Sequence, residues 1–232
     1  MSITNPTDII RQYLKQMGLM DAYCFRSNNP DMYRHFNYHC LADYVLDRGA
    51  AFDSAMLTTE ERAVVFSAAK QCGILFEPKQ CFHNAMMLTM FDGTNTIEFC
   101  EGYALTGSGM AVHHAWNVIN GKVVDLTRSL REEAVDEFLA GTPPQADLLD
   151  RVMGEYPATW GYLGVCFNRN QVQTYMTKNE QTGSLIHDHS RGFPLWLQDR
   201  LGNSEPFDPD DWDRLKFKAE GRLDLAVDGS GA

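Results

Sequence analysis

The spacing of apolar residues predicts three helices in the first third of the chain. Apolar residues recur at intervals of three and four in three stretches, which are residues 7–17, 30–47 and 58–72. Gly18 follows the last turn of the first stretch, and Thr58 with Glu61 has the spacing of a capping box at the start of the third. We therefore expect residues 1–78 to form an N-terminal helical portion.

The central part of the chain changes from helical to strand periodicity. Residues 81–90 are apolar on most sides, which is typical of a buried helix, and Cys81 opens that helix. Apolar and polar residues then alternate in three stretches, which are residues 96–104, 111–119 and 122–127. This pattern predicts a buried helix packed on an antiparallel sheet, which is an α+β fold.

The dipeptide Asn120-Gly121 predicts a tight hairpin with a two-residue type I′ turn. Such a turn pairs Ile119 with Lys122, Val118 with Val123, Asn117 with Val124, and Trp116 with Asp125. Because side chains alternate between the two faces of a sheet, His114 and Asp125 share one face, and His113 points to the other. His114 and Asp125 are then diagonal neighbours, roughly 7–8 Å apart at Cα. A register slip of one residue would reverse the choice of histidine.

The C-terminal half contains two further predicted helices, a strand and a capped helix. The helices are expected at residues 130–139 and 146–153, and the strand at 162–167. Asn168 or Asn170 is expected to cap the last helix. From Gly202 onward the sequence is charged and poor in core-forming residues, which indicates a peripheral segment.

Composition excludes several classes of partner. The 232 residues carry 20 basic and 31 acidic side chains, a net charge of −11. This balance argues against nucleic acid and anionic membranes as main partners, because both attract clusters of Lys and Arg. No stretch approaches the ~20 apolar residues that cross a bilayer. The N-terminus has no basic region followed by an apolar run, so we expect no secretory signal and a cytoplasmic location.

The six cysteines are scattered and include no C-x-x-C pair. In a chain without a secretory signal we expect reduced thiols, most of them buried as small hydrophobic residues. Cys81 differs from the others because it opens a helix, where the dipole and free N–H groups favour the thiolate. A cysteine followed by a histidine and an acid, here Cys81, His114 and Asp125, supplies a nucleophile, its base and an orienting group.

Four motifs occur in the order of a known superfamily. They are Cys81-Phe-His-Asn-Ala, Glu101-Gly-Tyr-Ala, His114-Ala-Trp-Asn and Val123-Val-Asp-Leu-Thr. Their order resembles the core of papain-like and transglutaminase-like cysteine enzymes. The segments 162–167 and 183–195 further resemble an uncharacterised bacterial and bacteriophage group of that class.

This resemblance covers residues 79 to 197. It implies a catalytic core over 79–200. Composition predicts an acidic peripheral tail over 201–232, and length favours one globular domain overall. The resemblance also implies a cysteine-dependent acyl-transfer enzyme (hydrolase, amidase, deamidase or transglutaminase-like) that acts on an amide bond without a cofactor. The substrate would be a protein, a peptide or a small amide, in the host cytoplasm if a phage encodes the protein.

Four further residues are candidates for substrate or oxyanion contacts. The Cys81 backbone N–H and Gln80 would bind the oxyanion. Glu101 and Trp116 flank His114 in sequence, and both are equally compatible with a structural role. Asp188 is a possible pocket residue through the resemblance alone.

Two other hypotheses stay open at the level of sequence. The chain could be an inactive member of the fold that serves as a binding or phage–host interaction protein. It could also hold a metal through Cys81, His83, His113, His114 and one of His187 and His189, although these spacings match no strong zinc pattern. His35 and His39 have the spacing of a two-histidine metal pair, but Tyr38 stands where that motif has glutamate. We therefore expect no metal site.

Overall fold

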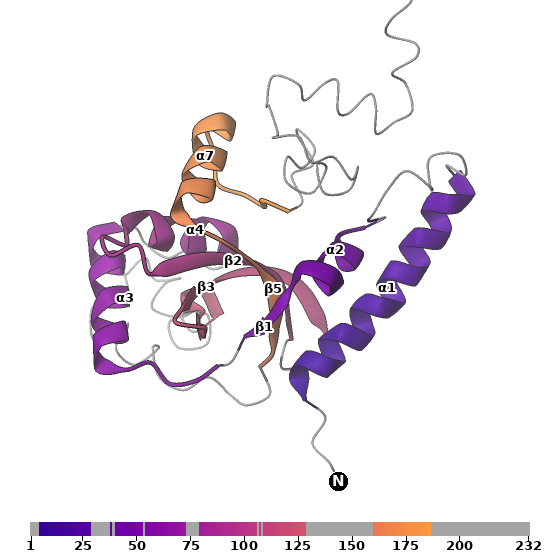
Figure 1. Ribbon diagram of the computed structural model, residues 1–232, viewed down its shortest axis with the longest axis horizontal. Coiled ribbons are helices and arrows are strands. Elements are labelled where there is room, and N and C mark those ends of the chain that lie inside the picture. The colour runs from indigo at the N-terminus through magenta and orange to yellow at the C-terminus, as the bar shows by residue number, and fades with distance from the viewer. Residues whose placement is uncertain are drawn as a thin grey trace, which may run out of the picture. The chain divides into compact units, whose positions relative to one another are not determined.

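The computed structural model describes residues 5–28, 38, 40–52, 54–72, 79–105, 107, 109–128 and 160–186 (Figure 1). The helices predicted for residues 130–139 and 146–153, and the tail from residue 202, lie outside the described residues. The described part is a mixed α+β structure with an antiparallel sheet. Its elements are α1 (Pro6–Asn28), α2 (Leu41–Arg48), β1 (Ala50–Phe52), α3 (Thr59–Cys72), α4 (Cys81–Phe91), β2 (Ile97–Leu105), β3 (Ala111–Ile119), β4 (Lys122–Val124), β5 (Tyr162–Phe167) and α7 (Arg169–Asn179).

The chain divides into two compact units, Met1–Arg11 with Arg48–Gly183 and Gln12–Asp47 with Ser184–Ala232. The first unit contains the whole sheet together with α3, α4 and α7. The helix predicted for residues 58–72 therefore belongs to the same unit as the strands. The expected division into 1–78, 79–200 and 201–232 stays a prediction.

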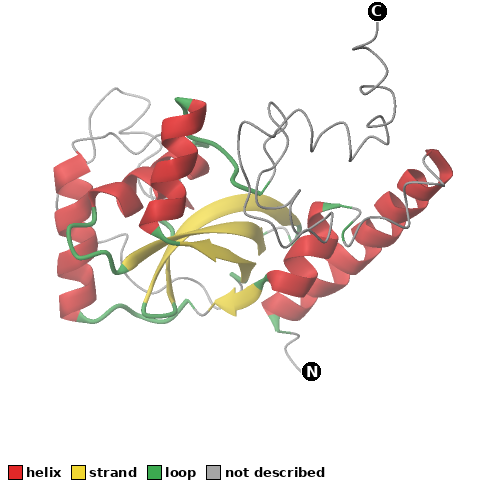
Figure 2. Ribbon diagram, turned by 45° about the horizontal axis from the view of Figure 1, so that its top comes forward, coloured by secondary structure: helices red, strands yellow, loops and turns green. Residues whose placement is uncertain are grey.

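The sheet has five strands in the order β1-β5-β2-β3-β4, and every neighbouring pair is antiparallel. The strands twist strongly and the sheet curls, as the yellow arrows in Figure 2 show. β2 and β3 form a long hairpin, whereas β5 returns from far along the chain to pair with the other edge of β2. The centre of the sheet is therefore assembled from one local and one long-range pairing.

The predicted hairpin register is confirmed. Asn117 pairs with Val124, Val118 with Val123, and Ile119 with Lys122. Asn120 and Gly121 both have positive φ, 51° and 77°, as a type I′ turn requires. The third predicted strand is shorter than expected, because β4 ends at Val124 and a helical turn begins at Leu126.

α4 packs on β2 and β3, and a buried asparagine fixes it there. The Asn117 amide donates to the Ala85 carbonyl (2.8 Å) and to the Thr89 hydroxyl (3.0 Å), so strand β3 is tied directly to the helix. Two apolar clusters occupy the first unit. One joins α3 and α4 to the sheet and includes Val65, Leu88 and Ile119; the other, centred on Trp116, contains Cys100, Ala104, Val118, Val123, Trp160 and Tyr162.

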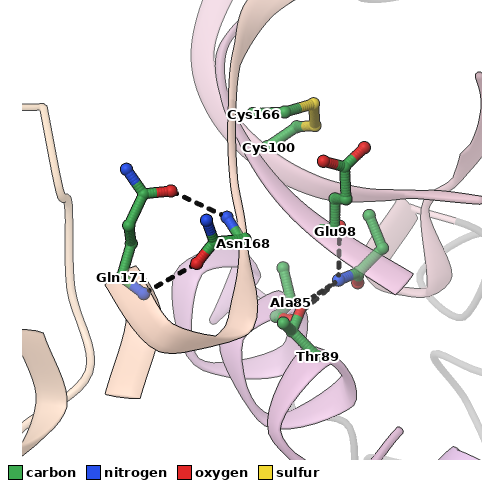
Figure 3. The surroundings of a disulfide bond; sticks show 8 residues. Ala85, Thr89, Glu98, Cys100, Cys166, Asn168 and Gln171 are labelled. Carbon is green, nitrogen blue, oxygen red and sulfur yellow. Dashed lines mark hydrogen bonds between the residues drawn. A yellow bond between two sulfur atoms is a disulfide. The ribbon is translucent and has the colours of Figure 1, made fainter. Parts of the chain in front are cut away.

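The capping predictions for two helices are confirmed. Thr58 and Glu61 exchange the two hydrogen bonds of a capping box ahead of α3, at 2.7 and 3.2 Å. Asn168 caps α7 in the same way, with Gln171 as its partner, as Figure 3 shows. Spacing of polar residues located the start of α3, whereas the structure decides for Asn168 over Asn170 at the start of α7.

The prediction that Gly18 ends the first helix is wrong. α1 continues to Asn28, and its cap is Asn5, whose side chain accepts from the Thr7 N–H at 2.9 Å. In the second unit, a Cβ atom on Gly18 would lie 2.5 Å from an Asp43 carboxylate oxygen. The glycine therefore allows α2 to approach the helix closely rather than stopping it. No described helix is long and apolar enough to span a membrane.

The expectation of reduced thiols is wrong for one pair. Cys100 on β2 and Cys166 on β5 form a disulfide (Figure 3), and the same two residues are direct partners in the β2–β5 register. This pairing follows from the return of β5 to the sheet, which is a contact across 66 positions. The spacing of the cysteines along the chain does not predict this disulfide. Cys40, Cys72 and Cys81 take no part in a disulfide.

Candidate active site

Cys81 is the first residue of α4 and is partly exposed. Gln80 is the N-cap residue, and Lys79 before it has a positive φ of 66°, so the chain turns sharply into the helix. The N–H groups of a first helical turn have no acceptor within their helix, and the helix dipole is positive there. The predicted position of Cys81 at a helix N-terminus is therefore confirmed.

His114 lies on β3 between the thiol and a carboxylate. Its Nε2 atom is 2.8 Å from Oδ2 of Asp125, and the Cys81 side chain lies near enough to the ring to favour its charged form. With Nε2 bound to the carboxylate, Nδ1 remains for the thiol. The side chain is only 7% exposed, so these contacts take place away from bulk water. The structure thus brings together the three residues that the sequence singled out.

The two titratable partners of His114 dominate its charge state. Burial of the imidazole lowers the pKa of His114, but the charge of Asp125 and hydrogen bonds with Asp125 and Cys81 outweigh burial and raise that pKa from 6.5 to about 10. Burial raises the pKa of Asp125, but the charge of His114, their hydrogen bond and Arg128 hold it below the usual 3.8. At neutral pH the pair is therefore an imidazolium and a carboxylate.

Asp125 occupies a different place from the one predicted. It does not lie within the strand but follows β4 directly, and its Oδ1 atom accepts the Arg128 backbone N–H at 3.1 Å. Asp125 therefore caps the helical turn that begins at Leu126, while Oδ2 faces His114. Capping fixes the carboxylate, because the Asp125 backbone leads into the turn and its Oδ1 atom is hydrogen-bonded to that turn.

Two residues that sequence reasoning missed also surround this carboxylate. The Tyr162 hydroxyl on β5 donates to Oδ2 of Asp125 at 2.9 Å, and Arg128 donates to the same hydroxyl at 3.3 Å. The Arg128 guanidinium also lies 3.7 Å from the centre of the Trp160 ring. Tyr162 was predicted as part of a strand, but nothing in the sequence indicates that this strand returns beside β2.

The Trp116 side chain is buried and packs against His114. Its ring is 1% exposed and lies nearly parallel to the imidazole, with centroids 6.3 Å apart and an interplanar angle of 18°. A Cβ atom on Gly164 would approach this ring to 2.5 Å, so the indole lies directly over that glycine. The indole N–H has no hydrogen-bond partner in the described part of the chain. Trp116 therefore packs in the hydrophobic core. The sequence had left open whether it lines a pocket or has a structural role.

Glu101 belongs to a separate pair on the opposite face of β3. Its carboxylate is fully buried and lies 2.9 Å from Nε2 of His113. The rings of Phe82 and Tyr103 flank that imidazole, with centroids 5.2 and 5.8 Å away. The structure therefore separates the two neighbouring histidines, as the hairpin parity predicted: His113 binds Glu101, and His114 binds Asp125.

The remaining candidates from the sequence are Gln80, Asp188 and the other histidines. The Gln80 side chain is exposed beside Cys81 and makes no capping hydrogen bond. His83 contacts the Thr182 hydroxyl at 3.2 Å. Asp188, His187 and His189 lie outside the described residues, as do His35 and His39. Among the residues that are described, no group of three or more His, Cys, Asp and Glu side chains is arranged to hold a metal ion.

Comparison of the chain with protein-family models, with curated protein sequences and with solved structures finds no match.

Proposed function

We propose that this protein is a cysteine-dependent acyl-transfer enzyme with a papain- or transglutaminase-like core. The observation that carries the proposal is the buried hydrogen bond between His114 and Asp125, together with a thiol at the start of α4 that favours the charged form of the same imidazole. Cys81 would be the nucleophile, His114 the general acid and base, and Asp125 the group that orients and charges the imidazole.

The first half of the reaction would cleave the acyl donor. The Cys81 thiolate attacks the carbonyl carbon of an amide in a protein, a peptide or a small molecule, and the carbonyl oxygen becomes an oxyanion. His114 gives its proton to the leaving amine, the C–N bond breaks, and a thioester on Cys81 remains. Neutral His114 then takes a proton from water or from an acceptor amine, which attacks the thioester and regenerates the thiolate.

Two donors beside the nucleophile would bind the oxyanion. The backbone N–H of Cys81 is in the first turn of α4, and the Gln80 amide is exposed and uncommitted to the helix cap. Loss of one oxyanion donor lowers kcat by about 10²–10³-fold in well-studied enzymes. On this proposal Gln80→Ala lowers turnover, whereas Gln80→Glu lowers it further because the carboxylate would repel the oxyanion.

The proposal is tested with a chromogenic activated aryl ester, which needs no knowledge of the natural substrate. The expected result is a stoichiometric burst of phenolate and an acyl group on Cys81, located by peptide mass spectrometry. Cys81→Ala should abolish the burst, and His114→Ala should slow it by at least 10²-fold, the usual contribution of a general base.

The matched control is Cys40→Ala, which removes another partly exposed thiol outside the disulfide. It should leave the burst unchanged. Acylation of Cys40 at the same rate as Cys81, or a burst that survives Cys81→Ala, would overturn the proposal. Such a result would favour the alternative of an inactive fold member that binds a partner.

A further inference from the structure

The hydroxyl of Tyr162 has a fixed hydrogen-bond direction. Arg128 can only donate, so the Tyr162 oxygen accepts from Nη1 of Arg128, and its single proton must point to Asp125. Tyr162 is fully buried, so water does not compete for this proton. The contacts therefore form a one-way chain from the guanidinium through the hydroxyl to the carboxylate.

The same carboxylate oxygen receives the imidazole. Oδ2 of Asp125 accepts from the Tyr162 hydroxyl at 2.9 Å and from Nε2 of His114 at 2.8 Å, while Oδ1 accepts the Arg128 backbone N–H. All three contacts donate to the ionised carboxylate, and each would be weakened if Asp125 were protonated. Among the described residues, the titratable side chains of His114, Tyr162 and Arg128 face this carboxylate, and Cys81 interacts with the same imidazole.

The sheet is built so that a side chain from β5 can reach this point. Gly102 of β2 lies between its partners His114 on β3 and Gly164 on β5, and it has no side chain on the face that His114 occupies. Tyr162 is two residues from Gly164 on the same face of β5, and its ring packs against Trp116 with centroids 5.1 Å apart. The paired glycines thus leave room for the tyrosine ring to extend toward the edge of the sheet.

We infer that Tyr162 is a positioning residue of the active site, which acts through Asp125 and is itself held by Arg128. This inference rests on the proposed function, in which Asp125 orients His114. Tyr162 keeps the carboxylate ionised and aimed at Nε2, and thereby keeps Nδ1 aimed at the Cys81 thiol. Its role resembles that of the outer-shell groups that orient ligands and catalytic side chains in other enzymes.

The test uses Tyr162→Phe, which removes the hydroxyl and retains the ring. The matched control is Tyr175→Phe, which removes the hydroxyl of another buried tyrosine, on α7. Imidazole NMR follows the exchange of the His114 Nε2 proton with water. Tyr162→Phe should accelerate exchange on the order of tenfold, because a hydrogen bond to a charged group is lost, and Tyr175→Phe should leave the exchange rate unchanged.

A second readout is the rate of Cys81 alkylation as a function of pH. Tyr162→Phe should move the acidic limb of this profile up by about one pH unit, because Asp125 then protonates more readily. In an Asp125→Asn background the same substitution should have no further effect, since the group through which it acts is gone.

The two readouts separate the two claims. Unchanged proton exchange in Tyr162→Phe, or an equal effect of Tyr162→Phe in the Asp125→Asn background, would overturn the positioning role while the proposed function stands. Faster exchange in a protein whose Cys81 is no more reactive than Cys40 would support the positioning role and overturn the proposed function.

Discussion

Four buried acids differ in the donors that surround them. Glu61 accepts from Lys122 and Asn120, and Asp92 accepts the backbone N–H groups of the turn that follows α4. Glu101 pairs with His113, whose imidazole is flanked by aromatic rings. Asp125 is the acid whose histidine also contacts a thiol. At the scale of residues, the groups that bind each acid therefore distinguish its role. Glu61, Asp92 and Glu101 stabilise the fold, whereas Asp125 is the acid proposed for the active site.

The role of Glu61 can be tested through its pKa. The Lys122 hydrogen bond, with those from Asn120 and Thr58, lowers the pKa of Glu61 from 4.5 to about 2. Its folded pKa lies below its unfolded pKa, so its contribution to stability is complete above pH 4.5 and is lost as the pH falls toward 2. Glu61→Gln should lower the free energy of unfolding at pH 7 by about 1–3 kcal/mol.

The same substitution should flatten the dependence of stability on pH between 4.5 and 2. Urea denaturation at neutral and acidic pH measures both effects. Glu98→Gln is the control, because Glu98 is an exposed carboxylate on β2, and its stability curve should follow that of the wild type. Parallel acid curves for wild type and Glu61→Gln would show that the ion pair with Lys122 contributes nothing.

At the scale of elements, local patterns located most of the described helices and strands, but not their long-range partners. The Asn120-Gly121 turn was enough to choose His114 over His113, because strand parity is a local property. The place of Tyr162 depends on β5 pairing with β2, and residues 129–159 intervene before that strand. The sequence assigned Asp125 to a strand because apolar and polar residues continue to alternate up to it. In the structure, its side chain caps the helical turn that follows β4.

Gly164 shows how an element outside the hairpin shapes the site. A Cβ atom there would lie 2.4 Å from the Glu101 carbonyl oxygen and 2.5 Å from the Trp116 ring. Gly164→Ala should therefore push β5 away from β2 and displace the indole that stacks on His114. We expect a loss of about 3 kcal/mol in the free energy of unfolding, together with a slower reaction at Cys81.

Thermal or urea denaturation and the aryl-ester burst measure these two losses. Gly93→Ala is the matched control, because a Cβ atom at Gly93 would meet nothing within 4 Å. It should change neither property. Wild-type stability in Gly164→Ala would mean that β5 can shift without cost and that the packing of Trp116 on Gly164 is not required.

At the scale of the whole molecule, the disulfide is the covalent link between distant parts of the chain. It joins β2 to β5 over a separation of 66 residues, and it lies in the same apolar cluster as Trp116 and Tyr162. Charge, length and cysteine spacing did not predict it, because the pairing exists only once β5 has joined the sheet. The link should stabilise the fold mainly by restricting the unfolded chain.

Reduction is therefore expected to lower the free energy of unfolding by about 2–4 kcal/mol. The double substitution Cys100→Ala and Cys166→Ala should lose a similar amount, and a reductant should then have no further effect. Denaturation with and without a thiol reductant gives all four values. If reductant leaves the wild type unchanged, or destabilises the double variant equally, the disulfide does not contribute to stability.

The most direct test of the central claim is the rate of Cys81 alkylation by iodoacetamide across pH 6 to 8, resolved by peptide mass spectrometry. An ordinary thiol with a pKa of about 8.5 gains about tenfold in rate for each pH unit in this range. A Cys81 thiolate paired with the His114 imidazolium should instead react at a nearly constant rate, and His114→Ala should restore the tenfold rise. A wild-type rate at Cys81 that climbs in parallel with that of Cys40 would contradict the account.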